Sequence, residues 1–98
     1  MPTKKITAPK TNVTKGFFIV VMDKGFVYVG SFEQTSNPAW FKLINSRNIR
    51  RYGTTKGIGE LALGGPTKET VLDETGDILV PLHSVCHLIF TDEKNWKR

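Results

Sequence analysis

The residues best suited to bind an anion are concentrated between positions 47 and 68. Arginine and lysine donate charge-assisted hydrogen bonds to phosphate oxygens, threonine hydroxyls donate neutral ones, and glycine lets an anion approach the backbone. The sequence therefore predicts a binding site for a phosphorylated small molecule, formed by Arg47, Arg50, Arg51, Tyr52, Thr54, Thr55, Lys56, Gly57 and Lys68. The alternative is that the threonines cap a helix and that the arginines are solvated or contact another subunit.

The arginines are expected to divide between the two faces of a strand predicted for residues 47–52. Because side chains alternate along a strand, Arg47 and Arg51 share one face, while Arg50 and Tyr52 share the other. At least one arginine should therefore point toward a pocket beside the start of the helix that follows.

Two segments of this region resemble nucleotide-binding motifs but lack part of what each motif requires. The segment GIGELA (57–62) matches the G-x-G-x-x-A pattern of dinucleotide-binding folds. That pattern needs a strand–helix–strand unit with an acidic residue about 20 positions downstream. Here antiparallel strands are predicted to follow, and residues 81–83 occupy the position of the acid. The segment GTTKGIGE (53–60) also lacks the spacing of a P-loop, so we expect no nucleoside triphosphate hydrolysis.

Metal and acid–base chemistry have weaker support in the sequence. His83 and His87 lie on one side of the last predicted strand and Cys86 lies on the other, so they cannot converge on one ion. Glu60 has no carboxylate partner nearby in the sequence, as paired carboxylates for acid–base work require. We therefore expect no catalytic residue, no metal and no cofactor, and we expect that the protein is not an enzyme.

The aromatic residues have two possible uses. Trp40 and Tyr52 are suited to stacking on a nucleic-acid base, although most aromatics in a domain of this size build the core. Trp96 lies in a polar tail and is expected to contact a neighbouring subunit.

Overall charge and composition bound the class of protein. The chain has 98 residues, a formal net charge of +5 and a pI near 9.6, which favours an anionic partner or serves solubility. A core of this size is marginally stable alone, so self-association is expected. The single Cys86 excludes an intrachain disulfide, and neither a signal peptide nor an apolar run of membrane-spanning length is visible. We expect a cytoplasmic protein, or one in a particle assembled there, with no membrane partner.

The apolar pattern predicts one β-rich domain at 16–91, between an extended basic arm at 1–15 and a polar tail at 92–98. Runs of β-branched and aromatic residues predict seven strand segments, at 16–22, 26–32, 39–44, 47–52, 69–73, 78–81 and 84–90. The last is apolar enough to be central in the sheet. Residues 74–77 predict a tight turn, and Pro81 should end the strand before it.

One short helix is predicted at residues 56–63. Its apolar residues follow helical spacing, Thr54 or Thr55 can cap its start, and the Gly-Gly-Pro segment at 64–66 can end it. The predicted fold class is mainly β: a small, strongly bent antiparallel sheet or partly open barrel of six to seven strands with one short helix.

Two sequence patterns, taken in their order along the chain, resemble those of a known protein family. An N-x-R-x-I-R-R-[YW] pattern, ending in NIRRY (48–52), is followed by G-x-x-E-L-A-x-x-G, containing GELALG (59–64). Over about residues 16–90 the chain resembles a family of small, mostly phage-encoded proteins of unknown function. The arm and the GTTKG turn look like additions to the family pattern. The resemblance implies a viral source, and hence a host cytoplasm or a virus particle, but no settled activity.

Three functions remain open at this point. In the first, a non-enzymatic homo-oligomer binds a phosphorylated small molecule, such as a nucleotide immune signal that it sequesters. The second is a structural protein of the virion, whose arm at 1–15 laces neighbouring subunits together. The third is a nucleic-acid binder that places the arm and the arginines on phosphates. We expect the first, because it alone uses the concentration of Arg, Thr, Lys and Gly around one helix start.

Overall fold

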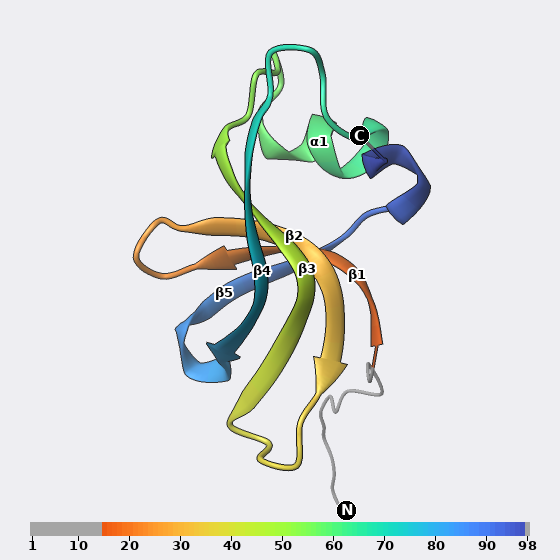
Figure 1. Ribbon diagram of the computed structural model, residues 1–98. Helices are drawn as coiled ribbons and strands as arrows, with labels where there is room; N and C mark the ends of the chain where they lie inside the picture. The colour runs from red at the N-terminus through yellow and green to blue at the C-terminus, as the bar shows by residue number, and fades with distance from the viewer. Residues whose placement is uncertain (1–14, 98) are drawn as a thin grey trace, which may run out of the picture.

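The computed structural model describes residues 15–97, and Figure 1 shows their arrangement. Five strands form one open antiparallel sheet in the order β4-β3-β2-β1-β5. The strands are β1 (Lys15–Met22), β2 (Val27–Gln34), β3 (Trp40–Arg51), β4 (Val71–Pro81) and β5 (Val85–Phe90). One α-helix and two short 3-10 helices complete the fold, namely α1 (Ile58–Gly64), η1 (Leu82–Ser84) and η2 (Glu93–Trp96).

The mainly β class, the antiparallel sheet and the single short helix are thus confirmed, with five strands where six to seven were predicted. The predicted arm lies outside the described residues, apart from Lys15 at the start of β1. The strands predicted at 16–22 and 26–32 correspond to β1 and β2, which pair as an antiparallel hairpin, and Gly25 supplies the positive φ of 92° in its turn. Helix α1 ends at a C-cap glycine, Gly65, whose N–H donates to the Leu61 carbonyl oxygen at 2.8 Å.

The strand count differs because two predicted breaks are irregularities inside long strands. Segments 39–44 and 47–52 merge into β3, and segments 69–73 and 78–81 merge into β4. The register between the strands shifts on both sides of the pair formed by Ser46 and Gly76; Gly76 has φ 73°, and Asn45, just before Ser46, has φ 51°. The buried Ser46 donates its hydroxyl hydrogen to the Gly76 carbonyl oxygen at 2.6 Å. These residues therefore form facing bulges and not turns.

The sheet has a core on each of its two faces, and the bulges transfer β3 and β4 from one core to the other along their length. Phe41 and Leu43 pack in one core while Ile49 packs in the other, although all three have odd numbers in β3. The helix-side cluster contains Ile19, Val27, Val29, Ile49, Leu61, Ala62 and Trp96. The edge-side cluster contains Phe18, Val20, Phe32, Phe41, Leu43 and Val80, with Ile78, Val85 and Leu88 packed against it.

Two predictions about the C-terminal part of the chain are wrong. The last strand, β5, lies at an edge of the sheet and not at its centre. Trp96 is only 1% exposed and belongs to the helix-side cluster, so its ring is not available to a neighbouring subunit. Its indole N–H donates to the Thr91 hydroxyl at 2.9 Å. The tail is therefore a packed part of the domain, where η2 lies beside α1 (Figure 1).

Candidate functional site

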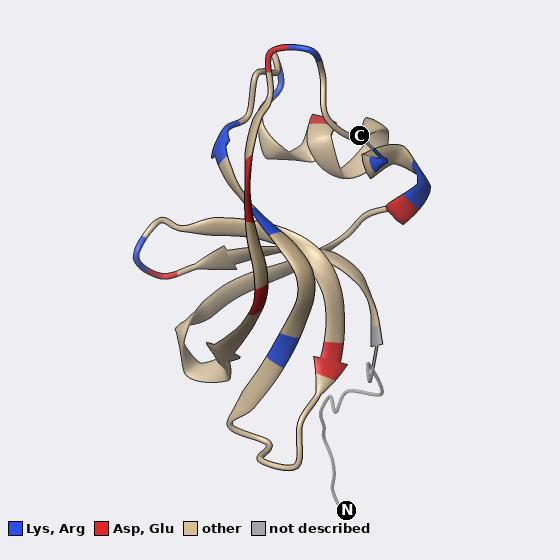
Figure 2. Ribbon diagram, viewed as in Figure 1, with Lys and Arg blue, Asp and Glu red and all other residues tan. Residues whose placement is uncertain are grey.

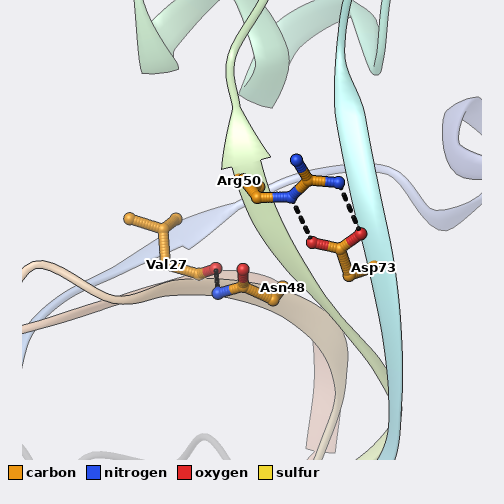
Figure 3. Close-up of polar contacts among 4 residues, drawn as sticks. All are labelled: Val27, Asn48, Arg50 and Asp73. Carbon is orange, nitrogen blue, oxygen red and sulfur yellow. Dashed lines mark hydrogen bonds and ion pairs between the residues drawn. The ribbon is translucent and has the colours of Figure 1, made fainter.

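The structure separates the three arginines of the predicted anion site. On the helix side of the sheet, the Arg47 guanidinium donates to the Trp96 carbonyl oxygen at 2.7 Å. Arg50 points to the other face and pairs with Asp73 on β4 (Figure 3). Arg51 is exposed at the end of β3. The predicted alternation of Arg47 and Arg50 is thus observed, but each of these two is already bonded within the domain.

Alternation predicted that Tyr52 and Arg50 share a face of the strand, and this prediction is wrong. The register between β3 and β4 shifts between Ile49 and Arg51, and this shift returns the next side chain to the helix side. Tyr52 is half-buried and packs against the helix-side cluster. Its ring is therefore partly used by the core.

Arg50 and Asp73 form a bidentate ion pair on the protein surface. Arg50 Nε donates to Asp73 Oδ2 at 2.7 Å, and Arg50 Nη2 donates to Oδ1 at 3.1 Å. These hydrogen bonds, together with the positive charge, hold the pKa of Asp73 below its ordinary value of 3.8. The side chains are 66% and 42% exposed, so water and salt screen the attraction.

The lowered pKa of Asp73 sets the direction of a pH effect. A carboxyl group whose pKa falls on folding stabilises the native state above its unfolded pKa, and this contribution is lost as the pH falls through the folded pKa. At pH 7 we expect a small coupling free energy between Arg50→Gln and Asp73→Asn in the free energy of unfolding. This coupling should disappear at acidic pH, below 3.8. A double-mutant cycle of urea unfolding at both pH values measures it. A coupling that is the same at both would contradict the pairing in solution.

The backbone amides near the start of α1 are occupied by a side chain of the protein itself. One carboxylate oxygen of Glu60, Oε1, accepts from the backbone N–H of Thr55 at 3.2 Å and of Lys56 at 3.1 Å. The N-cap is Gly57, which makes no side-chain cap, while the Thr54 hydroxyl donates to the Gly57 carbonyl oxygen at 2.8 Å. The prediction of a threonine cap is therefore wrong. These two amides are also not open to a phosphate.

Two other threonines join the loops on either side of α1. The Thr67 hydroxyl donates to the Gly53 carbonyl oxygen, and the Thr70 hydroxyl donates to the Tyr52 carbonyl oxygen, both at 2.6 Å. Thr70 is 4% exposed, so this contact lies inside the domain. We refer to residues 52–57 and 65–70 as the threonine-tied loops. The bonds hold two segments, separated by the helix, at one end of the molecule.

This end presents three exposed basic side chains. Lys56 and Lys68 come from the two threonine-tied loops, and Arg51 pairs with Val71 where the loops leave the sheet. Among residues 15–97 the ion pairs join Arg50 with Asp73 and Lys94 with Asp92, so none of the three is neutralised by an ion pair. Figure 2 shows basic segments at this end, with acidic ones beside them. Of the basic residues predicted for the anion site, Arg51, Lys56 and Lys68 are therefore exposed at this end, whereas Arg47 and Arg50 are bonded elsewhere in the domain.

A cavity that the sequence did not predict lies at the bulges. Its volume is about 290 Å³, and its lining includes Asn45, Ser46, Arg47, Glu74 and Trp96. Of the predicted site residues only Arg47 lines it, and the lining mixes charges of both signs. A second cavity, of about 270 Å³, is apolar and is lined by residues such as Phe32, Trp40, Phe41, Leu82 and Leu88.

The first cavity could not be predicted, because it depends on the positive φ of Asn45 and on the burial of Ser46. In the local sequence this pair of residues is typical of a turn.

The positive charge of the chain is distributed unevenly. Residues 1–15 contain four lysines and no acidic residue, whereas residues 16–97 contain nine basic and nine acidic side chains. The folded body is thus formally neutral. The excess of +5 arises from residues 1–15 and from Arg98.

The described residues offer little support for a metal site or a membrane-spanning segment. Within 15–97 no three His, Cys, Asp or Glu side chains are grouped so that they would hold a metal ion. No helix in that range is long and apolar enough to cross a membrane. Comparisons with protein-family models, with curated proteins and with solved structures find no match to this chain.

Proposed function

We propose that the chain is a non-enzymatic, self-associating binding protein for a phosphorylated small molecule, such as a nucleotide immune signal that a phage would sequester. The ligand contacts the exposed cations Arg51, Lys56 and Lys68 at the threonine-tied loops. The observation that carries the proposal is that threonine hydrogen bonds tie together, at one end of the domain, the backbones of the two segments that carry Arg51 and Lys56 on one side of α1 and Lys68 on the other. Such pre-organisation lowers the entropy that a ligand must remove on binding.

The chemistry of recognition differs from that of a helix-start site. Because Glu60 occupies the Thr55 and Lys56 amides, the phosphate is held by side chains: a forked pair of bonds from Arg51 and single bonds from the lysines. These charges are exposed, and the Glu60 and Glu69 carboxylates lie in or near the same loops. Binding should therefore weaken as salt is added.

Calorimetry with a panel of mononucleotides and cyclic dinucleotides tests this function. Arg51→Ala removes the one arginine of the proposed site and should weaken binding about tenfold or more, a loss of about 1.4 kcal/mol. Lys24→Ala is the matched control, because it removes an exposed cation in the β1–β2 turn and should leave the affinity unchanged. No heat with any nucleotide, or equal losses in both variants, would exclude the proposed site.

Nucleic-acid binding is the second candidate, and the charge distribution favours it. Three of the arm lysines, Lys4, Lys5 and Lys10, lie in residues 1–14. If they neutralise phosphates, deleting residues 1–14 should reduce the slope of log affinity against log salt by roughly 2–3. A small-molecule site instead predicts that the deletion leaves nucleotide affinity unchanged. Retention of nucleic acid with an unaltered slope would exclude a role of the arm in binding it.

A further inference from the structure

The cavity at the bulges of β3 and β4 is lined by charged residues of both signs. Arg47 on β3 and Glu74 on β4 lie directly opposite each other in the strand register. Glu93 begins η2, and Lys97 follows it. Two carboxylates and two cations therefore line a volume of about 290 Å³, and their formal charges cancel at pH 7. The cavity is neutral overall but strongly polar.

Three of these four charges have no ionic partner among residues 15–97. The ion pairs within that range involve other side chains, so Glu74, Glu93 and Lys97 take part in none. Arg47 is different, because it is half-buried and its guanidinium donates to the Trp96 carbonyl oxygen at 2.7 Å, which fixes its charge at the wall. A ligand that carries both signs of charge would therefore pair with groups that the fold leaves to water.

The rest of the lining includes an apolar wall and a constrained backbone. Phe17 and Ile44 are half-buried there, beside the buried Trp96. Asn45 has a left-handed φ of 51°, and residues in such sparsely populated conformations cluster at ligand sites. A pocket of this kind, apolar with a few convergent polar groups, is typical of small-molecule sites, and its volume suits a small ligand.

We propose that this cavity binds a free α-amino acid with an apolar side chain. The ammonium group of the ligand pairs with the Glu74 and Glu93 carboxylates, its carboxylate lies toward Arg47 and Lys97, and its side chain lies against the apolar wall. A phosphorylated ligand does not fit here, because the two carboxylates would repel it. The site is separate from the threonine-tied loops, so the inference goes beyond the proposed function and does not depend on it.

Calorimetry with free leucine, methionine and phenylalanine tests the class of ligand. At least one of them should bind saturably. Its N-acetyl derivative, which lacks the ammonium charge, and its amide, which lacks the carboxylate, should each bind about tenfold more weakly or worse. No heat with any of the three would overturn the proposal. An amide that binds as tightly as the free amino acid would also overturn it, since the site would then recognise an organic cation.

A pair of variants locates the site. Glu74→Gln keeps the shape of the side chain but removes its charge, and it should weaken binding of the free amino acid about tenfold. Glu33→Gln is the matched control, because Glu33 is an exposed carboxylate near the end of β2 that does not line the cavity. Circular dichroism checks that both variants fold. Equal affinities in the two variants would place the ligand elsewhere and overturn the proposal.

Discussion

Replacing Trp96 with alanine is expected to lower the free energy of unfolding by about 3–5 kcal/mol, a large fraction of the stability of a small domain. The side chain is 1% exposed, and its ring centroid lies 6.4 Å from that of Phe17. Its indole N–H donates to the Thr91 hydroxyl, which in turn donates to the Ala62 carbonyl oxygen at 2.7 Å. Trp96 thus joins the tail, α1 and the sheet, and its removal leaves a cavity where they meet.

Urea unfolding followed by circular dichroism measures this loss. Trp40→Ala is the matched control, because Trp40 is 41% exposed and should cost far less. Both variants are compared at the same protein concentration, since association shifts apparent stability. Equal losses in the two variants, or a loss below about 1 kcal/mol for Trp96→Ala, would contradict the packing of the tail.

Gly53→Ala is expected to destabilise the domain by about 2–5 kcal/mol, the sum of a left-handed backbone and a steric clash. Gly53 has φ +66°, and a Cβ atom there would lie 2.5 Å from both the Glu69 carbonyl oxygen and the Thr70 nitrogen. The threonine hydrogen bonds to Gly53 and Tyr52 hold these segments together, so the backbone cannot move aside without breaking them. The threonine-tied loops should separate.

Gly57→Ala provides an internal control for this prediction. Gly57 also has a positive φ, +79°, but a Cβ atom there would meet nothing within 4 Å. Its ψ of −153° places it in a backbone region that is almost exclusive to glycine, so its cost should be limited to a backbone strain of about 1–3 kcal/mol, without the added clash. Thermal unfolding of both variants measures the difference. If the two variants lost the same stability, the close approach of the loops would be contradicted.

The local parts of the fold were predictable from the sequence. Runs of β-branched and aromatic residues predicted the two strands of the β1–β2 hairpin, and a helical pattern followed by glycine predicted α1 and its end. The long strands were not predictable, because polar pairs such as Asn45-Ser46 look like turns when read alone. They form bulges only because Ser46 and Gly76 meet across two strands, and that contact joins residues 30 positions apart.

The candidate site was predictable only in part for related reasons. Alternation correctly placed Arg47 and Arg50 on opposite faces, but it does not reveal the partners that each finds, Trp96 and Asp73. The sequence indicates only that Glu60 lacks a carboxylate partner, although its position five residues after Thr55 lets it accept from the loop amides. The burial of Trp96 depends on the packing of η2 against α1, which the polar sequence around it does not indicate.

The facing bulges of β3 and β4 have a consequence for how this small protein can change. Because they transfer burial from one face of the sheet to the other, the threonine-tied loops rest on the helix-side cluster, whereas Leu88, two residues before Phe90, packs on the edge-side cluster. A substitution that reshapes one core leaves most packing partners of the other in place. The two ends of the molecule can therefore accept core substitutions separately, because each end packs on its own cluster.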